Sequence, residues 1–97
     1  MEARGYVYMM SDRYRGAIYT GVTSDLPRRV WQHKNGQGSE FVRTYKLHRL
    51  VYMELSDSIV AAIEREKAIK KWRRAWKIEL IESMSPDWLD LYERLNG

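Results

Sequence analysis

The sequence predicts a small α+β fold, in which a three-stranded antiparallel sheet is flanked by helices. Two segments near the start, residues 6–10 and 17–22, are rich in aromatic and β-branched residues, which are typical of strands. A third such segment lies at residues 49–54. Elsewhere, apolar residues recur at helical spacing. These observations together favour a single α+β domain over residues 1–97.

The first two strands are predicted to form a hairpin, because residues 11–16 supply Ser, Asp and Gly for the turn. A symmetric loop pairs Met10 with Ala17 and, two steps further out, Tyr8 with Tyr19. Directly opposed residues point to the same face of a sheet. We therefore expect the two tyrosines to stand side by side.

A helix is expected to begin near Asp25, which can cap it, with Pro27 in the first turn. Gly36 and Gly38 are expected to end this helix. A short helical or irregular segment should follow at residues 40–45, before the third strand.

Three helices are expected after the third strand. The first begins with Ser56 or Asp57 as its cap and continues through Trp72. The second covers about residues 74–83. Ser85 and the proline after it should start a short helix in the acidic tail, residues 85–97.

The composition is that of a globular protein, because 44% of the 97 residues are hydrophobic and 31% are charged. The absence of cysteine excludes a disulfide framework and a thiolate metal site, and it suits a reducing compartment. The apolar runs are too short to span a bilayer, and the start lacks a signal-peptide pattern. We therefore expect a cytoplasmic protein with no membrane partner.

The net charge of +4 is unevenly distributed. Residues 65–77 carry seven basic residues and one acidic residue, whereas residues 78–97 are mostly acidic where charged. This asymmetry indicates either an oriented polyanion-binding face or a solvated helix face. Trp72 and Trp76 lie within the basic segment; we expect their rings in the core and some of the charges on phosphate groups.

Glu66 shares a helical stripe with the apolar residues Ile59, Ala62, Ile63 and Ile69. A carboxylate aimed at the core is costly unless it is paired or bound to a metal. Glu66 is therefore either a buried partner of an arginine or a ligand of a hard cation such as Mg²⁺, which needs only one or two carboxylates.

Arg29 and His33 are four residues apart and so share one face of their helix. An arginine can clamp a phosphate group, and a histidine can donate or shuttle a proton near neutral pH. The alternative is an ordinary surface pair. His48 has no comparable neighbour and is interpreted as structural.

These residues together resemble the GIY-YIG nuclease superfamily. The resemblance rests on Tyr6-Val7-Tyr8 and Tyr19-Thr20-Gly21 on the hairpin, followed by Arg29, His33 and Glu66. It covers about residues 5–81 and is greatest to the small stand-alone bacterial members. The sequence departs from the family pattern at Tyr6, at Thr20, and at Val22, close to where some members carry a lysine.

The resemblance implies a GIY-YIG-like fold and a metal-dependent endonuclease that hydrolyses phosphodiester bonds. Glu66 would hold one divalent ion, Mg²⁺ or Mn²⁺, and Arg29 would contact the scissile phosphate. Tyr19 would orient or deprotonate the attacking water, supported by Tyr8. His33 would bond to Tyr8 or the phosphate, or share the proton transfer.

Tyr6 and Gly21 belong to the structural motif, and Gly21 is expected to permit a close backbone approach. The expected partner is nucleic acid, DNA in preference to RNA, cut in a structure-preferring way in repair or processing. A catalytically silent nucleic-acid-binding module and a protein-interaction domain are the alternatives. The residues expected to contact nucleic acid are Arg28, Lys34, Lys70, Lys71, Arg73, Arg74 and Lys77.

Overall fold

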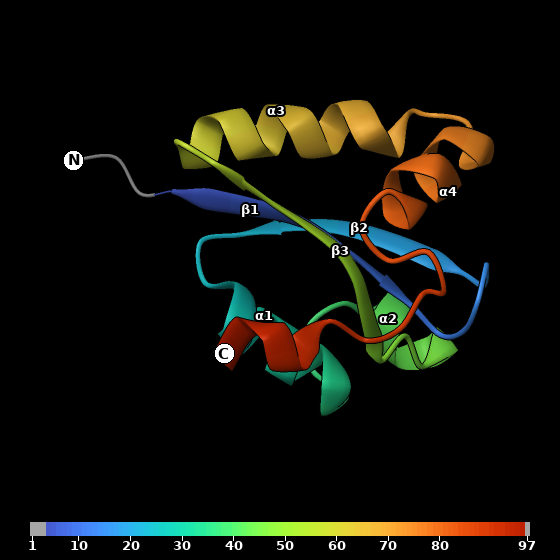
Figure 1. The fold of residues 1–97 in the computed structure, drawn as a ribbon. Helices are drawn as coiled ribbons and strands as arrows, with labels where there is room; N and C mark the ends of the chain where they lie inside the picture. Colours follow the sequence, from blue (N-terminus) through green and yellow to red (C-terminus); the bar gives the residue numbers. More distant parts are fainter. Residues whose placement is uncertain (1–3, 97) are drawn as a thin grey trace.

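The computed structural model describes residues 4–96 and confirms the α+β class. Its sheet is antiparallel and has the order β2-β1-β3, with β1 (Gly5–Ser11) between β2 (Ile18–Thr23) and β3 (Arg49–Ser56). Helices cover both faces of this sheet (Figure 1). The helical elements are α1 (Leu26–Lys34), α2 (Glu40–Tyr45), α3 (Ile59–Lys70), α4 (Arg74–Glu82) and the 3₁₀ helix η1 (Tyr92–Asn96). No helix in residues 4–96 is long and apolar enough to cross a membrane.

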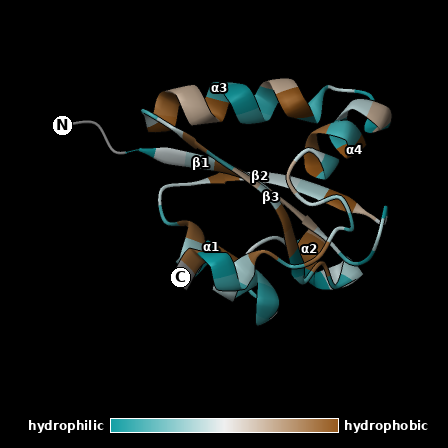
Figure 2. Cartoon of the chain, in the orientation of Figure 1, coloured by the Kyte–Doolittle hydropathy of each residue, from teal (hydrophilic) through white to brown (hydrophobic). Residues whose placement is uncertain are grey.

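Strand β1 is buried on both faces and therefore builds two cores. Val7 and Met9 point to the α3 and α4 side, where Ala62 and Ile69 pack against them. The alternate residues of β1 point to the α1 side and pack with Leu26, Val30 and Leu50. Figure 2 shows hydrophobic as well as hydrophilic residues along α3. Successive side chains of β1 thus point to opposite faces and form two separate apolar layers, one under α3 and one on the α1 side.

The register of the hairpin differs from the symmetric prediction. Met10, not Tyr8, lies opposite Tyr19, and Tyr8 lies opposite Gly21. The reason is local: the Asp12 carboxylate accepts the N–H of Ala17 at 2.9 Å, so Ala17 stays in the loop. The shift is two residues, which preserves the face of every side chain. Tyr8 and Tyr19 are consequently diagonal neighbours on one face.

The helix boundaries follow the predicted capping chemistry in part. Asp25 caps α1 by accepting the N–H of Arg28 at 3.4 Å, as predicted. Ser58, not Ser56 or Asp57, caps α3 through the N–H of Ala61 at 3.1 Å. Helix α3 ends at Lys70, so Trp72 lies in the corner before α4.

The prediction of a helix starting at Ser85 is wrong. Within residues 85–96 the only helical element is η1, and the preceding segment follows β3 instead. The N–H of Leu91 donates to the carbonyl of Leu50 at 2.8 Å, and the buried Trp88 has a positive φ of 58°. Backbone groups that a helix would satisfy internally are therefore bonded to the sheet edge.

Candidate active site

A buried hydrogen bond between Tyr8 and His33 forms the centre of the site. Tyr8 comes from the middle of β1 and His33 from the last turn of α1, and each residue is only 1% exposed. The Tyr8 Oη and His33 Nε2 atoms are 2.7 Å apart. The His33 Nδ1 atom is buried without a hydrogen-bond partner within residues 4–96. Tyr8 thus fixes the imidazole from one side.

Tyr19 is the more exposed of the two tyrosines. It comes from the edge strand β2, and its ring centroid lies 6.2 Å from that of Tyr8 and 5.5 Å from that of His33. The His33 ring meets Tyr19 edge-on, at an interplanar angle of 68°. Three rings from three elements therefore converge, with Tyr19 on the outside.

Gly21 makes this convergence possible. A Cβ at this position would lie 2.6 Å from the Cζ and Oη atoms of Tyr8 and 2.9 Å from Cε2 of Tyr19. The expectation of a close backbone approach is thus corrected, since the group that approaches Gly21 is the Tyr8 side chain. Tyr6, the other motif residue, is half-buried against the α1 side of the sheet.

Gly38 is a neighbour of the site that the sequence pattern did not reveal. A Cβ there would lie 3.1 Å from His33 Cε1 and 3.5 Å from Nη1 of Arg29. Its φ of +88° also favours glycine. The two glycines after α1 were visible in the sequence, but both were explained by their predicted role in ending that helix.

The electrostatics of the cluster keep its buried members uncharged. Burial raises the pKa of Tyr8 well above its ordinary value; charges on Tyr19 and Glu66 raise it further, and Arg29 partly offsets this. Burial, with the positive charge of Arg29, lowers the pKa of His33. At neutral pH a phenol therefore faces a neutral imidazole.

Glu66 reaches this cluster from α3. Its side chain is 13% exposed, and its Oε2 atom lies 3.0 Å from Nζ of Lys70, one helical turn later. Its negative charge raises the pKa of Tyr8 slightly, after the larger effects of burial and of Tyr19. Glu66 is therefore paired with a lysine on its own helix, and not with an arginine.

The donor set around Glu66 suits a cation that needs few protein ligands. Residues 4–96 contain no group of three or more His, Asp or Glu side chains placed to hold a metal ion. Mg²⁺ is commonly bound through one or two carboxylates, with water and substrate phosphate completing its shell. The single, largely buried carboxylate of Glu66 on α3 fits that requirement.

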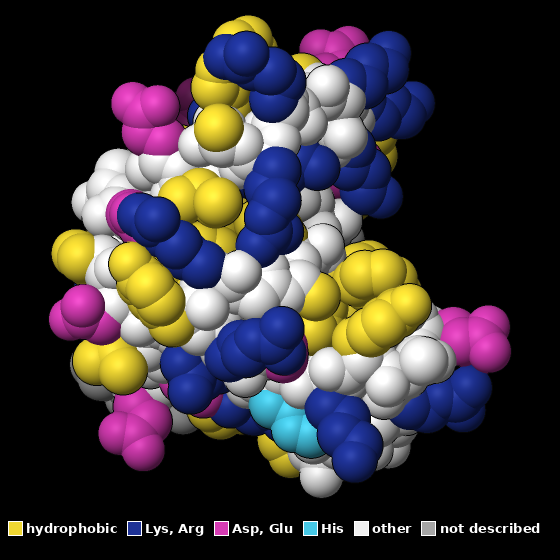
Figure 3. Space-filling model, turned by 90° about the vertical axis from the view of Figure 1, so that its right-hand side faces the viewer, with side chains coloured by type: hydrophobic (Ala, Val, Ile, Leu, Met, Phe, Trp, Pro, Cys, Tyr) yellow, Lys and Arg dark blue, Asp and Glu magenta, His cyan; other side chains and the backbone are white. Residues whose placement is uncertain are grey.

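Basic and aromatic side chains line a cavity of about 280 Å³ beside Tyr19. Besides Tyr19, it is bounded by Ile18, Thr20, Phe41, Lys70 and Lys77. Figure 3 shows one face of the molecule with a hollow that has Lys and Arg side chains above it and hydrophobic side chains below it. Lys70 and Lys77 thus bring positive charge to Tyr19.

The other predicted contacts to nucleic acid divide into two groups. Arg28, Lys71 and Arg73 are exposed, and they stay predicted contacts. Lys34, by contrast, forms an ion pair with Asp90 and donates to the carbonyl of His48 at 2.9 Å. Arg74 donates to the carbonyls of Arg15 and Gly16, each at 2.6 Å. We therefore propose that Lys34 and Arg74 hold the fold together rather than contact nucleic acid.

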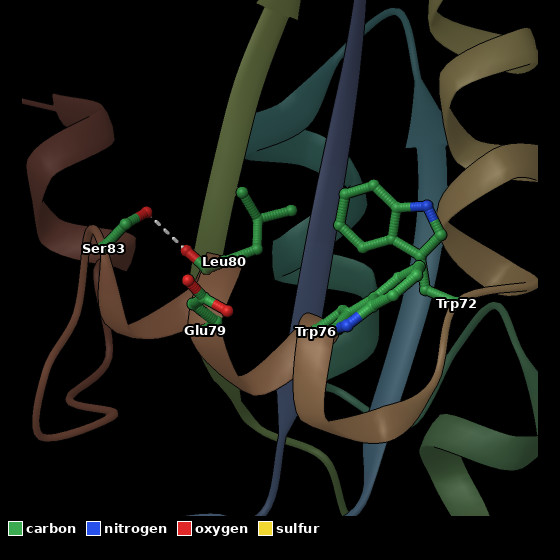
Figure 4. A pocket seen from close by; sticks show the side chains of 5 residues that line it. All are labelled: Trp72, Trp76, Glu79, Leu80 and Ser83. Atoms are coloured by element: carbon green, nitrogen blue, oxygen red, sulfur yellow. Dashed lines mark hydrogen bonds between the residues drawn. The ribbon is translucent and has the colours of Figure 1, made fainter.

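A larger cavity, of about 460 Å³, lies away from this cluster, at the corner between α3 and α4 (Figure 4). Trp72 and Trp76 line it with Glu79, Leu80 and Ser83, and the two indole rings meet edge-on. Trp76 is 47% exposed, so the expectation that both rings are in the core is wrong for this one. None of the five predicted catalytic residues borders this cavity, so we place the site at the tyrosine cluster.

Comparison with known proteins agrees with this geometry. The sequence model of the GIY-YIG catalytic domain matches residues 4–79, most of the chain. The chain belongs to the GIY-YIG family. Membership in this family implies nuclease-type chemistry on nucleic acid.

Similar proteins in bacteria carry the name UPF0213 protein. One from Staphylococcus saprophyticus is 36% identical over 76 residues, covering 78% of this chain and 92% of the relative. One from Syntrophus aciditrophicus is 34% identical over 83 residues, covering 82% and 92%. One from Staphylococcus aureus is 35% identical over 77 residues, covering 79% and 90%. The resemblance to small bacterial GIY-YIG proteins is therefore confirmed. No solved structure matches the chain significantly.

Proposed function

We propose that this protein is a metal-dependent endonuclease that hydrolyses phosphodiester bonds, with structured DNA in repair or processing as its substrate. One observation carries the proposal. Tyr8, Tyr19, Arg29, His33 and Glu66 come from four elements of the fold and act on one another around a single buried hydrogen bond.

Glu66 would hold the divalent ion, Mg²⁺ or Mn²⁺. When bound, such an ion polarises the phosphate and stabilises the leaving oxygen. Lys70 contacts the Oε2 atom of Glu66 and so offsets the charge of this carboxylate in the protein alone.

Arg29 would bind the scissile phosphate. Arg29 is half-buried, and both its guanidinium and the His33 ring lie close to Gly38. A fixed guanidinium offsets the negative charge that grows on the phosphate oxygens in the transition state. Because Gly38 has no side chain, this guanidinium has room beside the imidazole.

Tyr19 would orient the attacking water and accept its proton. A tyrosine that acts as a base needs positive charge nearby, and the position after Gly21 is Val22 rather than a lysine. Lys70 and Lys77 border the same cavity as Tyr19 and can supply that charge from α3 and α4. Tyr8, which burial keeps as a neutral phenol, would keep Tyr19 in place through ring contact.

The test is a cleavage assay on supercoiled plasmid and branched DNA with Mg²⁺, Mn²⁺ or EDTA. We expect cutting with either metal and none in EDTA. Arg29→Ala should lower the rate by about 100-fold or more, and Glu66→Gln should remove the metal-dependent cutting. Glu64→Gln is the matched control, since Glu64 is exposed on the same helix, and it should cut like the wild type.

The second candidate is a catalytically silent nucleic-acid-binding module. The replacement of the lysine by Val22 and the pairing of Glu66 with Lys70 favour it. It predicts DNA binding that weakens with salt but is indifferent to Mg²⁺ and to loss of Glu66. A wild type that binds DNA and cuts with neither metal would establish this alternative.

A further inference from the structure

Helix α2 carries two aromatic side chains that its folding does not use. The helix is attached to the α1-side core through Val42, which is fully buried, while Phe41 and Tyr45 are 43% and 56% exposed. Their ring centroids lie 4.7 Å apart, as the spacing of four residues on a helix allows. Exposed aromatic pairs of this kind are typical of binding surfaces.

These two rings continue the cluster of the candidate site toward solvent. The ring of Phe41 lies 6.4 Å from that of Tyr19, with the planes only 28° apart, and Tyr45 lies beyond Phe41. Rings therefore follow one another from the buried His33 through Tyr19 to the surface of α2.

Positive charge flanks this row of rings. Phe41 and Tyr19 share their cavity with two lysines, Lys70 and Lys77. The ammonium group of Lys70 contacts Glu66 at 3.0 Å and that of Lys77 donates to the carbonyl of Lys70 at 3.3 Å, so both are fixed beside this cavity. A ligand that complements the rings and the lysines must carry a flat ring system and a negative charge close to each other. A nucleotide has this combination, with the base on the rings and the phosphate on the lysines.

We infer that Phe41 and Tyr45 form a stacking platform for an unpaired nucleobase next to the scissile phosphate. This inference rests on the proposed function and specifies its substrate. Bases inside a duplex have both faces covered by their neighbours, so only an unpaired, frayed or flap nucleotide can stack on the platform. The protein then prefers nucleic acid that is single-stranded at the cleavage site.

The test measures binding in EDTA, where metal-dependent cutting does not interfere. Fluorescence anisotropy compares a labelled single-stranded oligo-dT with a blunt duplex of the same length. Phe41→Ala should weaken single-strand binding by about 5-fold to 100-fold and change duplex binding by less than about twofold. Phe41→Trp keeps a ring and should restore single-strand binding, whereas Phe41→Leu keeps only apolar bulk and should not.

Trp31→Ala is the matched control, because Trp31 is an aromatic residue on α1 with a similar exposure of 49%. It should leave both affinities unchanged, and circular dichroism checks that each variant is folded.

If Phe41→Ala or Phe41→Leu binds oligo-dT like the wild type, the platform does not exist, while cleavage by the wild type still supports the proposed function. If the wild type binds neither probe, the inference and the nucleic-acid substrate both fail. Tighter binding of an acidic peptide than of oligo-dT would assign the surface to a protein partner instead.

Discussion

The Tyr8 hydroxyl and the His33 imidazole share a buried hydrogen bond of 2.7 Å that joins β1 to α1 across 25 positions of the chain. Within residues 4–96, the other ring nitrogen of His33 has no hydrogen-bond partner. The position of the imidazole therefore depends on Tyr8, on the packing of Gly38 and on the edge contact with Tyr19.

Tyr8→Phe should lower the free energy of unfolding by about 1–3 kcal/mol, because it leaves the His33 Nε2 atom buried without a partner. Urea unfolding at neutral pH measures the change. Tyr45→Phe removes a hydroxyl from a residue that is 56% exposed and should change stability by less than about 0.5 kcal/mol. Equal effects of the two substitutions would mean that the buried bond adds nothing to stability.

Gly21→Ala should disable the site, because the added Cβ would lie 2.6 Å from the Tyr8 ring and hydroxyl. Overpacking of this kind costs about 1–3 kcal/mol and displaces the ring. Both the free energy of unfolding and the cleavage rate of the folded fraction should fall.

Gly36→Ala separates backbone strain from damage to the site. A Cβ at Gly36 meets no atom within 4 Å, although its φ of +74° makes alanine costly there. This variant should lose about 1 kcal/mol of stability yet cleave at the wild-type rate. Wild-type cleavage by Gly21→Ala would show that Tyr8 can move without consequence.

The sequence predicted the order of the elements because each one carries its own local signal. Asp25 with Pro27 marks the start of α1, and the aromatic and β-branched residues at 6–10 mark β1. Four of the five predicted catalytic residues lie together in the structure: Tyr8, Tyr19, Arg29 and His33. The register error of two residues kept Tyr8 and Tyr19 on one face. Their chemical roles stay predictions.

The errors arose where a contact outside the local pattern decides the outcome. Within the hairpin loop, Asp12 accepts the N–H of Ala17, so the first pair of the hairpin is Ser11 with Ile18. The tail after α4 bonds to β3 through Leu91, so the helical signal at Ser85 is overridden. Phe41 joins the site only because the chain folds back beside β2, which no local pattern announces.

The stability should depend on the charge of His33. Its pKa is lowered in the folded protein, so the unfolded chain binds the proton more tightly. The stabilisation is therefore complete above the unfolded pKa of about 6.5 and is lost as the pH falls below it through the folded value. The groups that face the imidazole are Tyr8, Tyr19 and Arg29, and the arginine opposes protonation.

Urea unfolding between pH 7.5 and pH 5 measures this dependence on His33. The wild type should lose stability over that range more steeply than His33→Gln, which has no proton to gain at that position. Because the carboxylates are the same in both proteins, the difference between the two curves isolates the histidine. Parallel curves would contradict the lowered pKa.

Lys71 and Arg74 should behave oppositely, although they are only three residues apart in the basic segment. Lys71 is exposed and predicted to contact phosphate, so Lys71→Ala should reduce the slope of log K against log salt for duplex DNA by about 0.9. The stability of this variant should be unchanged.

Arg74→Ala removes a charged donor from the carbonyls of Arg15 and Gly16 and should lower the free energy of unfolding by about 1–3 kcal/mol. The salt slope of Arg74→Ala should equal that of the wild type, because its guanidinium is bound to the β1–β2 loop rather than available to DNA. A reduced slope for Arg74→Ala, with unchanged stability, would return Arg74 to the nucleic-acid interface.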